Sequence, residues 1–172
     1  MKKILVVVDM QNDFIDGALG TAEAVAIVPY VKSLIEGFDG EVFFTRDTHA
    51  ENYMDTEEGR NLPVPHCIKG THGWQIRAEL DALRRTEAID KVTFGSVDLA
   101  SQLARENLVS PLSEIEILGL CTDICVISNA FLLKAALPEC EISVNSALCR
   151  GVSPESHGNA LAAMAACQIN II

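Results

Sequence analysis

The chain has 172 residues, 49% of them hydrophobic, and its 13 lysines and arginines against 24 aspartates and glutamates give a formal net charge of −11 at pH 7. This length predicts a single domain over residues 1–172, and the negative charge argues against nucleic acid and anionic membranes as partners. No apolar stretch of about 18 residues is present, and the apolar run Ile4–Val8 is too short for a signal-peptide core, so we expect a cytoplasmic protein.

The hydrophobic pattern predicts strands and helices that alternate along the chain. In order, the elements are strand Ile4–Val8, helix Ala22–Glu36, strand Glu41–Thr45, helix Gln75–Arg85, strand Ala88–Val92, helix Val97–Asn107, strand Glu114–Leu120, helix Thr122–Leu137, strand Glu141–Asn145, helix Pro154–Cys167 and strand Gln168–Ile172. Pro29 predicts a kink or a late start for the first helix. The alternation predicts a three-layer, doubly wound, Rossmann-like α/β fold of about six mainly parallel strands with helices on both faces.

One segment, Arg46–Trp74, interrupts this rhythm. It is polar, rich in glycine and proline, and carries three of the four histidines. Loops of this length are usually functional or disordered, and the histidines favour function. Trp74 is expected to anchor the loop in the core, while His72 is interpreted as loop polarity and His157 as a helix-start residue.

The six cysteines do not indicate disulfides, because a chain of this size has an ample core and no secretory context. No Cys-x-x-Cys pair is present, so a thiolate zinc site is not expected. Most of the six are interpreted as small buried hydrophobic residues.

Polar side chains follow the ends of the first four predicted strands, and in a parallel sheet ligands bind beyond these ends. They include Asp9, Asp47, Lys91 and, in the turn that opens the next helix, Cys125. Free N–H groups at a helix start stabilise a thiolate or an oxyanion, Lys91 would lower the thiol pKa further, and Asp9 could carry a proton. Each of these residues also has an ordinary interpretation when it is taken singly. Cys125 fits a packing residue, Asp9 a cap at a strand end, and Lys91 a solvated surface residue.

A second group of polar residues suits a metal. Asp47 and His49 point the same way on an extended chain, and His66 follows Pro63 and Pro65, two prolines that stiffen the chain. Carboxylate and imidazole ligands favour zinc, iron or manganese and leave positions open for water or substrate. Solvated loop residues are the alternative interpretation.

Four ordered motifs carry a resemblance to a known family. They are VDMQNDF at Val8–Phe14, TRDTH at Thr45–His49, PHCIKGT at Pro65–Thr71, and GLCTDICV at Gly119–Val126, with Lys91 between the last two. Across nearly its whole length the sequence resembles the isochorismatase-like cysteine hydrolase superfamily, and within it the nicotinamidase/pyrazinamidase branch.

The resemblance implies a role for each matched position. It implies a catalytic triad of Asp9, Lys91 and Cys125, a cis bond between Leu120 and Cys121, and an oxyanion hole formed by the backbone N–H groups of Cys121 and Cys125. It also implies a divalent metal ion, zinc or else iron or manganese, held by Asp47, His49 and His66 with Glu58, or Glu57 in its place. Phe14 would line the ring pocket. The family habit further suggests a homo-oligomer.

The implied activity is hydrolysis of a small-molecule amide, nicotinamide to nicotinate and ammonia, through a thioester on Cys125. Two departures concern the substrate. Pro63 stands where nicotinamidases usually have an aromatic residue, and Phe94–Ser96 only loosely matches the usual motif after the lysine. The alternatives are another superfamily hydrolysis, of the isochorismate vinyl ether or of a carbamoyl or ureido group, and a non-catalytic binding or redox module.

Overall fold

A six-stranded sheet, parallel at every pairing, forms the centre of the computed structural model, which describes residues 2–172. Its strands are β1 (Lys2–Val8), β2 (Glu41–Asp47), β3 (Ile89–Lys91), β4 (Leu112–Leu120), β5 (Glu141–Arg150) and β6 (Asn170–Ile171). They lie in the order β3-β2-β1-β4-β5-β6, so the chain builds one half of the sheet outward from β1 and then the other. The predicted doubly wound α/β fold is confirmed.

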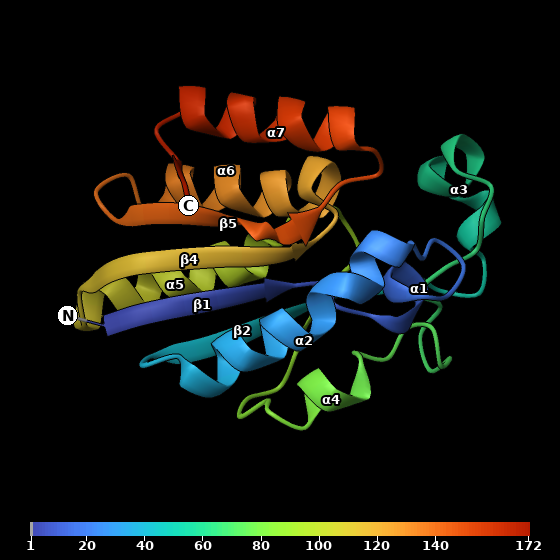
Figure 1. Ribbon diagram of the computed structural model, residues 1–172, viewed down its shortest axis with the longest axis horizontal. Coiled ribbons are helices and arrows are strands. Elements are labelled where there is room, and N and C mark those ends of the chain that lie inside the picture. Colours follow the sequence, from blue (N-terminus) through green and yellow to red (C-terminus); the bar gives the residue numbers. More distant parts are fainter. Residues whose placement is uncertain (1) are drawn as a thin grey trace.

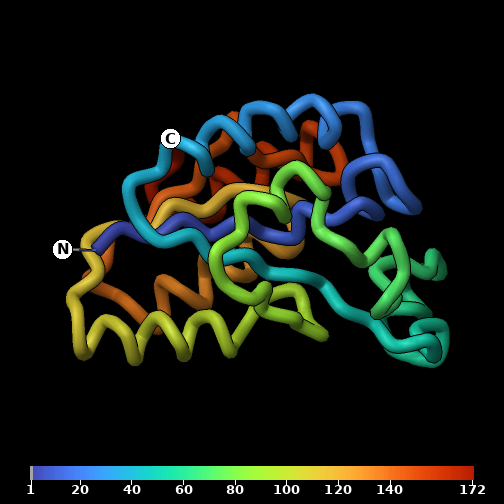
Figure 2. Tube along the Cα trace, turned by 90° about the horizontal axis from the view of Figure 1, so that it is seen from below, coloured from blue at the N-terminus to red at the C-terminus, as the bar shows by residue number. Residues whose placement is uncertain are grey.

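Helices cover both faces of the sheet. The long ones are α2 (Ala22–Gly37), α5 (Val97–Val109), α6 (Ile127–Ala136) and α7 (Pro154–Ala166). Figure 2 shows α2 on one face and α5 with α6 on the other, and in Figure 1 α7 runs along the edge formed by β5 and β6. Three begin at a hydroxyl N-cap, Thr21, Ser96 or Ser153, whose side chain accepts an N–H of the first turn.

The core forms around β1, which pairs with β2 on one side and β4 on the other. Ile4–Val8 is fully buried, as a strand covered by helices on both faces requires. Gly119 has φ +124°, and a Cβ there would collide with the Val8 carbonyl, so only glycine lets β4 approach β1 so closely. Burial of β1 fixes the position of Asp9, the buried polar residue that directly follows this strand.

Short elements gather at the carboxyl end of the sheet. They are α1 (Asn12–Ile15), the 3₁₀ turn η1 (Tyr53–Asp55), α3 (Glu57–Asn61) and the π-helical turn η2 (Thr122–Val126), while α4 (Ala78–Asp81) lies beside α2. Figure 1 shows α1 and α3 beyond the arrowheads of the strands. The segment Arg46–Trp74 is therefore an ordered cap that contains η1 and α3.

Several predicted boundaries are wrong. The first long helix starts at Ala22 and continues through Pro29, so the late start is not seen. Helix Gln75–Arg85 shrinks to α4, because the backbone before it bonds elsewhere: the Arg77 N–H donates to the Met10 carbonyl. The helix expected from Thr122 begins as η2, and β5 continues to Arg150, past a register shift on its partner β4.

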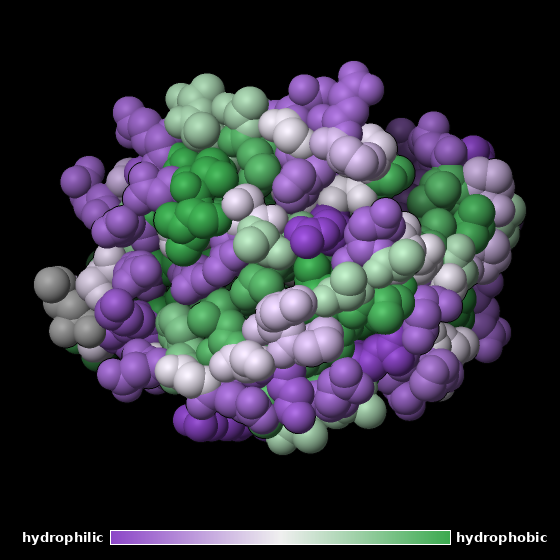
Figure 3. Space-filling view, in the orientation of Figure 1, coloured by the Kyte–Doolittle hydropathy of each residue, from purple (hydrophilic) through white to green (hydrophobic). Residues whose placement is uncertain are grey.

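The surface carries many polar side chains, as expected for a chain with this net charge. In Figure 3 hydrophilic side chains cover most of the visible face, with apolar residues in separate patches between them. Within residues 2–172, none of the helices combines the length and the apolar character needed to cross a bilayer. All six cysteines are free, and four of them are buried.

Candidate active site and metal centre

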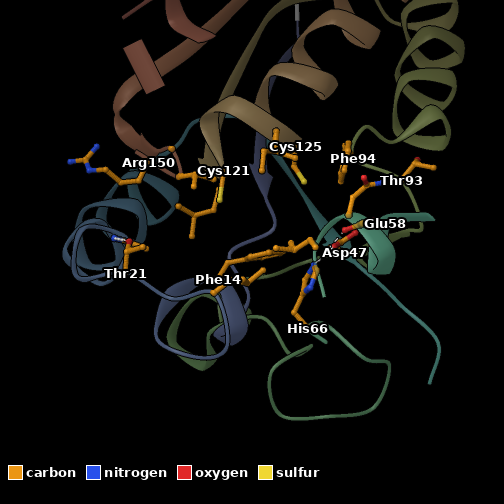
Figure 4. A pocket seen from close by; sticks show the side chains of 18 of the residues that line it. Phe14, Thr21, Asp47, Glu58, His66, Thr93, Phe94, Cys121, Cys125 and Arg150 are labelled. Atoms are coloured by element: carbon orange, nitrogen blue, oxygen red, sulfur yellow. Dashed lines mark hydrogen bonds and ion pairs between the residues drawn. The ribbon is translucent and has the colours of Figure 1, made fainter. Parts of the chain in front are cut away.

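The sheet order makes neighbours of the strands that end in the predicted polar residues. A pocket of about 710 Å³ opens at these ends. Figure 4 shows Cys121 and Cys125 on one side of it and Asp47, Glu58 and His66 on another. One cavity thus brings the candidate nucleophile together with the candidate metal ligands.

Lys91 connects three parts of the site. Its Nζ lies 2.7 Å from Asp9 Oδ2, 3.2 Å from Asp47 Oδ1 and 3.5 Å from Cys125 Sγ. Asp9 is fully buried at the end of β1, in the left-handed region at φ +47°, and its Oδ1 accepts a 2.7 Å hydrogen bond from the Thr45 hydroxyl. Asp9, Lys91 and Cys125 therefore form the group that the sequence predicts.

The pKa values in this group follow from burial first. Burial raises the pKa of the Asp9 carboxyl, and the attraction of Lys91 only partly opposes it. Burial alone would lower the pKa of Lys91, but the attraction of the Asp9 carboxylate, together with that of Asp47, outweighs it and raises that pKa. The buried ammonium is thus held charged by its acidic neighbours.

Cys125 departs from the expectation of a lowered thiol pKa. Burial raises its pKa well above the usual value, and the Asp9 charge adds to this, while Lys91 acts in the opposite direction without prevailing. The side chain is only 4% exposed. The resting residue is therefore a protonated thiol, and nucleophilic attack needs a base to remove its proton.

The turn before α6 shapes the backbone around this thiol. In η2 the Val126 N–H donates to the Cys121 carbonyl at 3.0 Å, a five-residue step that is wider than an α-helical turn. The Leu120–Cys121 peptide bond is cis, as the resemblance implies. Such π-helical turns are rare and occur often at functional sites.

Four side chains converge on one point at the other side of the pocket. One ligand atom each of Asp47, His49, Glu58 and His66 lies within 4.8 Å of the other three. The Nε2 atoms of the two histidines lie 3.0 and 3.6 Å from Asp47 Oδ2, and 3.6 and 3.7 Å from Glu58 Oε1. Two imidazole nitrogens and two carboxylate oxygens are a donor set that suits zinc, iron or manganese.

The second nitrogen of His66 supports this assignment. Its Nδ1 lies 2.9 Å from the Val64 carbonyl, which can only accept, so Nδ1 carries the hydrogen and Nε2 of the neutral ring presents its lone pair. Burial would lower the pKa of His66, but the nearby Asp47 carboxylate, with the Val64 carbonyl, outweighs it and raises that pKa. A metal ion between these side chains would take the position of the proton that the raised pKa of His66 favours on its Nε2.

Glu58 rather than Glu57 joins the cluster. Both glutamates lie in the first turn of α3, which is capped by Thr56, whose hydroxyl accepts the Gly59 N–H at 3.0 Å. Glu58 points to the histidines, whereas Glu57 lines the pocket outside the cluster. Gly59 has no room for a Cβ against the Tyr53 backbone, so α3 packs directly on η1.

Supporting residues escaped the sequence reasoning. Tyr53 stacks edge-on against the rings of His49 and His66, with centroids 4.8 and 5.1 Å apart, and its hydroxyl donates to the Leu62 carbonyl. Asp13 Oδ2 accepts the Cys67 N–H at 2.7 Å and so fixes the residue after His66. Asp13 lies within the VDMQNDF motif and Tyr53 lies four residues after the TRDTH motif, but nothing in the sequence assigned either residue this role.

The sequence predicted roles for two aromatic residues, Phe14 and Trp74. Phe14 lines the pocket, and its ring centroid lies 5.4 Å from that of His66. Trp74 packs against the core, and its Nε1 donates to the Thr48 hydroxyl at 2.8 Å. Trp74 thus anchors the loop as expected, with the Arg46 guanidinium 3.6 Å above its ring.

Known proteins share this sequence pattern and this fold. The isochorismatase domain family matches residues 3–172. An uncharacterised isochorismatase-family protein of Bacillus subtilis is 33% identical over 147 residues, which cover 76% of this chain and 77% of that protein. The nicotinamidase/pyrazinamidase of Mycobacterium tuberculosis is 30% identical over 149 residues, which cover 74% and 76%. The crystal structure of the pyrazinamidase of Pyrococcus horikoshii in complex with zinc superimposes with a TM-score of 0.81 at 27% identity, covering 100% of this chain and 99% of that one.

Proposed function

The chain belongs to the isochorismatase family, and on this premise we propose that it is a cysteine-dependent amidohydrolase that converts a small amide, such as nicotinamide, to the acid and ammonia. One observation carries the proposal. Lys91 lies within 3.5 Å of both Asp9 and Cys125, and the thiol opens into the pocket that also holds the candidate metal cluster. The relationship to a nicotinamidase/pyrazinamidase supports the choice of substrate class.

Acylation begins at the Cys125 thiol. Asp9 takes the thiol proton, which is the role that its raised pKa suits, because a stronger base at the end of β1 removes a proton more readily. The sulfur attacks the amide carbonyl carbon, and the carbonyl becomes an oxyanion. Lys91 stays charged throughout and stabilises whichever neighbour is negative.

We assign the oxyanion to the backbone N–H groups of Cys121, which directly precedes η2, and of Cys125, which lies within it. Collapse of this intermediate breaks the carbon–nitrogen bond. Asp9 returns its proton to the leaving nitrogen, ammonia departs, and the acyl group remains on Cys125 as a thioester.

Deacylation repeats the same proton movements with water. Asp9 removes a proton from water as the oxygen attacks the thioester, and the two N–H groups hold the second oxyanion. The carbon–sulfur bond then breaks, the acid leaves, and Cys125 recovers its proton from Asp9. The balance is one amide and one water consumed, and one acid and one ammonia released.

Asp47, His49, Glu58 and His66 would hold a divalent metal ion, and the similarity to a zinc-bound pyrazinamidase supports zinc over iron or manganese. Bound there, the ion would supply a Lewis acid beside the substrate pocket. Phe14 would contact the substrate ring from the side of His66.

Ammonia release from a panel of small amides tests the proposal. We expect the purified, metal-loaded protein to hydrolyse nicotinamide or a related amide, and Cys125→Ala to lose the activity, while Cys167→Ala, which changes an exposed cysteine, keeps it. The panel includes ureido and carbamoyl compounds and isochorismate, whose cleavage in place of the amides would favour the other hydrolyses of the superfamily. An active Cys125→Ala variant would refute the mechanism.

A further inference from the structure

Two consecutive side chains of the turn η2 are held from outside it. Thr122 Oγ1 lies 2.8 Å from His157 Nδ1, and the Asp123 carboxylate accepts the Val152 N–H at 3.1 and 3.3 Å. Val152 lies in the segment that joins β5 to α7, and His157 lies in the first turn of α7. The start of α7 therefore holds the turn that directly follows Cys121 and contains Cys125, the two predicted oxyanion donors.

The sequence builds this clamp locally. Ser153 and Ser156 cap α7 reciprocally, each hydroxyl accepting the other residue's N–H at 3.1 Å. The His157 N–H follows with a 3.0 Å bond to the Ser153 carbonyl. A Cβ at Gly151 would lie 2.9 Å from the His157 Cβ, so the glycine lets the end of β5 pass close to this residue. The ring is thereby fixed against η2.

Thr122 depends on this contact. The residue is fully buried, and a buried hydroxyl without a partner costs about 1–3 kcal/mol. Among residues 2–172, the hydrogen bond with His157 is the one that its side chain makes. The wide hydrogen bond that closes η2 also gives the turn less internal support than an α-helical turn has.

The His157 ring is suited to accept a hydrogen bond from the Thr122 hydroxyl. Burial lowers its pKa, and the positive charge of Arg150 lowers it further, while Asp123 acts in the opposite direction. The ring is therefore neutral at pH 7, and with its hydrogen on Nε2 it accepts from Thr122 through Nδ1.

We propose that His157 is a positioning residue: its hydrogen bond to Thr122 holds η2 so that the Cys121 N–H and the Cys125 thiol keep the mutual geometry that the hydrolysis needs. This role rests on the proposed function, and it requires no contact between His157 and the substrate. Thr122 is the intermediary, because it directly follows Cys121 and lies three residues before Cys125. A misplacement of about 1 Å in such a constellation can cost about 100-fold in rate.

The first test compares two variants of the same residue. His157→Leu removes both ring nitrogens at similar bulk, whereas His157→Asn keeps an acceptor near the place of Nδ1. We expect His157→Leu to lower kcat on nicotinamide about tenfold with KM within about twofold, since one hydrogen bond is lost and the substrate contacts remain. His157→Asn should recover most of the loss. Equal kcat in all three proteins would overturn the proposal.

A second readout does not need turnover. The rate at which iodoacetamide alkylates Cys125, followed by peptide mass spectrometry, reports the placement of the thiol, with Cys167 as the internal standard. We expect a severalfold change in the ratio of the two rates in His157→Leu and a return toward the wild-type ratio in His157→Asn. If no amide is hydrolysed by the wild type, the proposed function fails, while this ratio still decides whether His157 positions the thiol. An unchanged ratio in His157→Leu would overturn the positioning role.

Variants of Thr122 test whether His157 acts on the turn through the Thr122 hydroxyl. Thr122→Ser keeps the hydroxyl and Thr122→Val removes it, so Ser should resemble wild type and Val should resemble His157→Leu. The double variant Thr122→Val/His157→Leu should be no worse than either single one, because both remove the same bond. Fully additive losses would show that His157 acts by another route. If His157→Leu does not fold, the Thr122→Ser and Thr122→Val pair decides on the same readouts.

Discussion

The Gln11 side chain pairs with both backbone polar groups of Asp47. Its Nε2 donates to the Asp47 carbonyl at 2.8 Å and its Oε1 accepts the Asp47 N–H at 2.7 Å. Nε2 also donates to the Trp74 carbonyl at 2.8 Å. This amide thus joins the segment after β1, the end of β2 and the end of the long loop, and it fixes the backbone of a candidate metal ligand.

Gln11→Glu tests that relationship. The carboxylate can still accept the Asp47 N–H, but it cannot donate to the two carbonyls, so Asp47 loses part of its support. Outer-shell changes of this kind cost about 10–100-fold in metal affinity, and we expect a loss in that range for zinc, measured by competition with a chelator of known affinity. Gln168→Glu, which changes an exposed residue after α7, is the control and should bind zinc as wild type does. Undiminished affinity in Gln11→Glu would contradict the supporting role.

The neighbouring glutamates of α3 offer a matched pair for the metal cluster. Glu58 Oε1 lies 3.6 and 3.7 Å from the two histidine nitrogens, whereas Glu57 stands outside the cluster. Glu58→Gln should lower zinc affinity at least about tenfold, because a charged ligand becomes neutral, and Glu57→Gln should leave it unchanged. Metal content after dialysis against a graded chelator series measures both. Equal losses in the two variants would mean that only the local charge matters.

Thr45 should set the acid limb of the pH–rate profile. Its hydroxyl donates to Asp9 Oδ1 at 2.7 Å and stabilises the carboxylate, which counteracts the rise that burial causes in the Asp9 pKa. Asp9 must be deprotonated to act as the base, so kcat/KM rises with pH through this pKa. Removing the bond in Thr45→Val raises the pKa further and should move the acid limb upward by about one pH unit.

The control for this shift is Thr45→Ser, which keeps the hydroxyl and should keep the wild-type limb. The profile is recorded as kcat/KM on one amide, because that ratio reports the groups of the free enzyme. An acid limb that stays in place in Thr45→Val, or moves to lower pH, would remove Asp9 from the role of base.

The buried pair of Asp9 and Lys91 makes a prediction about stability. Breaking a buried ion pair by removing one partner costs about 3–5 kcal/mol, since the other charge is left without compensation. We expect Lys91→Met to lower the free energy of unfolding by about that much in chelator-treated protein, measured by urea denaturation, and Asp9→Asn to lower it by less, because Lys91 keeps Asp47 as a partner. The double variant should lose less than the two together.

A surface pair gives the comparison for this cycle. Lys3 and Glu114 lie 2.9 Å apart with side chains 55% and 32% exposed, so solvent screens this pair and Lys3→Met should leave the urea midpoint nearly unchanged. Additive losses for Asp9→Asn and Lys91→Met would indicate that the two side chains stabilise the protein independently.

The hydrophobic pattern along the chain was enough to predict the succession of strands and helices. Ile4–Val8 is apolar without interruption because both of its faces are buried, and this shows directly in the sequence. The boundaries of the helices Gln75–Arg85 and Thr122–Leu137 failed for the opposite reason. Their backbone groups bond to distant partners or adopt a wide turn, and helical spacing of apolar residues carries no trace of either.

The sequence by itself determined the fold class, the strand ends that carry Asp9, Asp47 and Lys91, and the motifs that indicate the family, because these depend on residue type and spacing along the chain. Only the tertiary structure decided between Glu58 and Glu57, and only it brought Gln11 to Asp47 and His157 to Thr122. It also reversed the expected shift in the Cys125 pKa. The physical reason is common to all of these: each depends on burial and on contacts between segments far apart in the chain, which form only when the sheet is assembled and its two faces are covered.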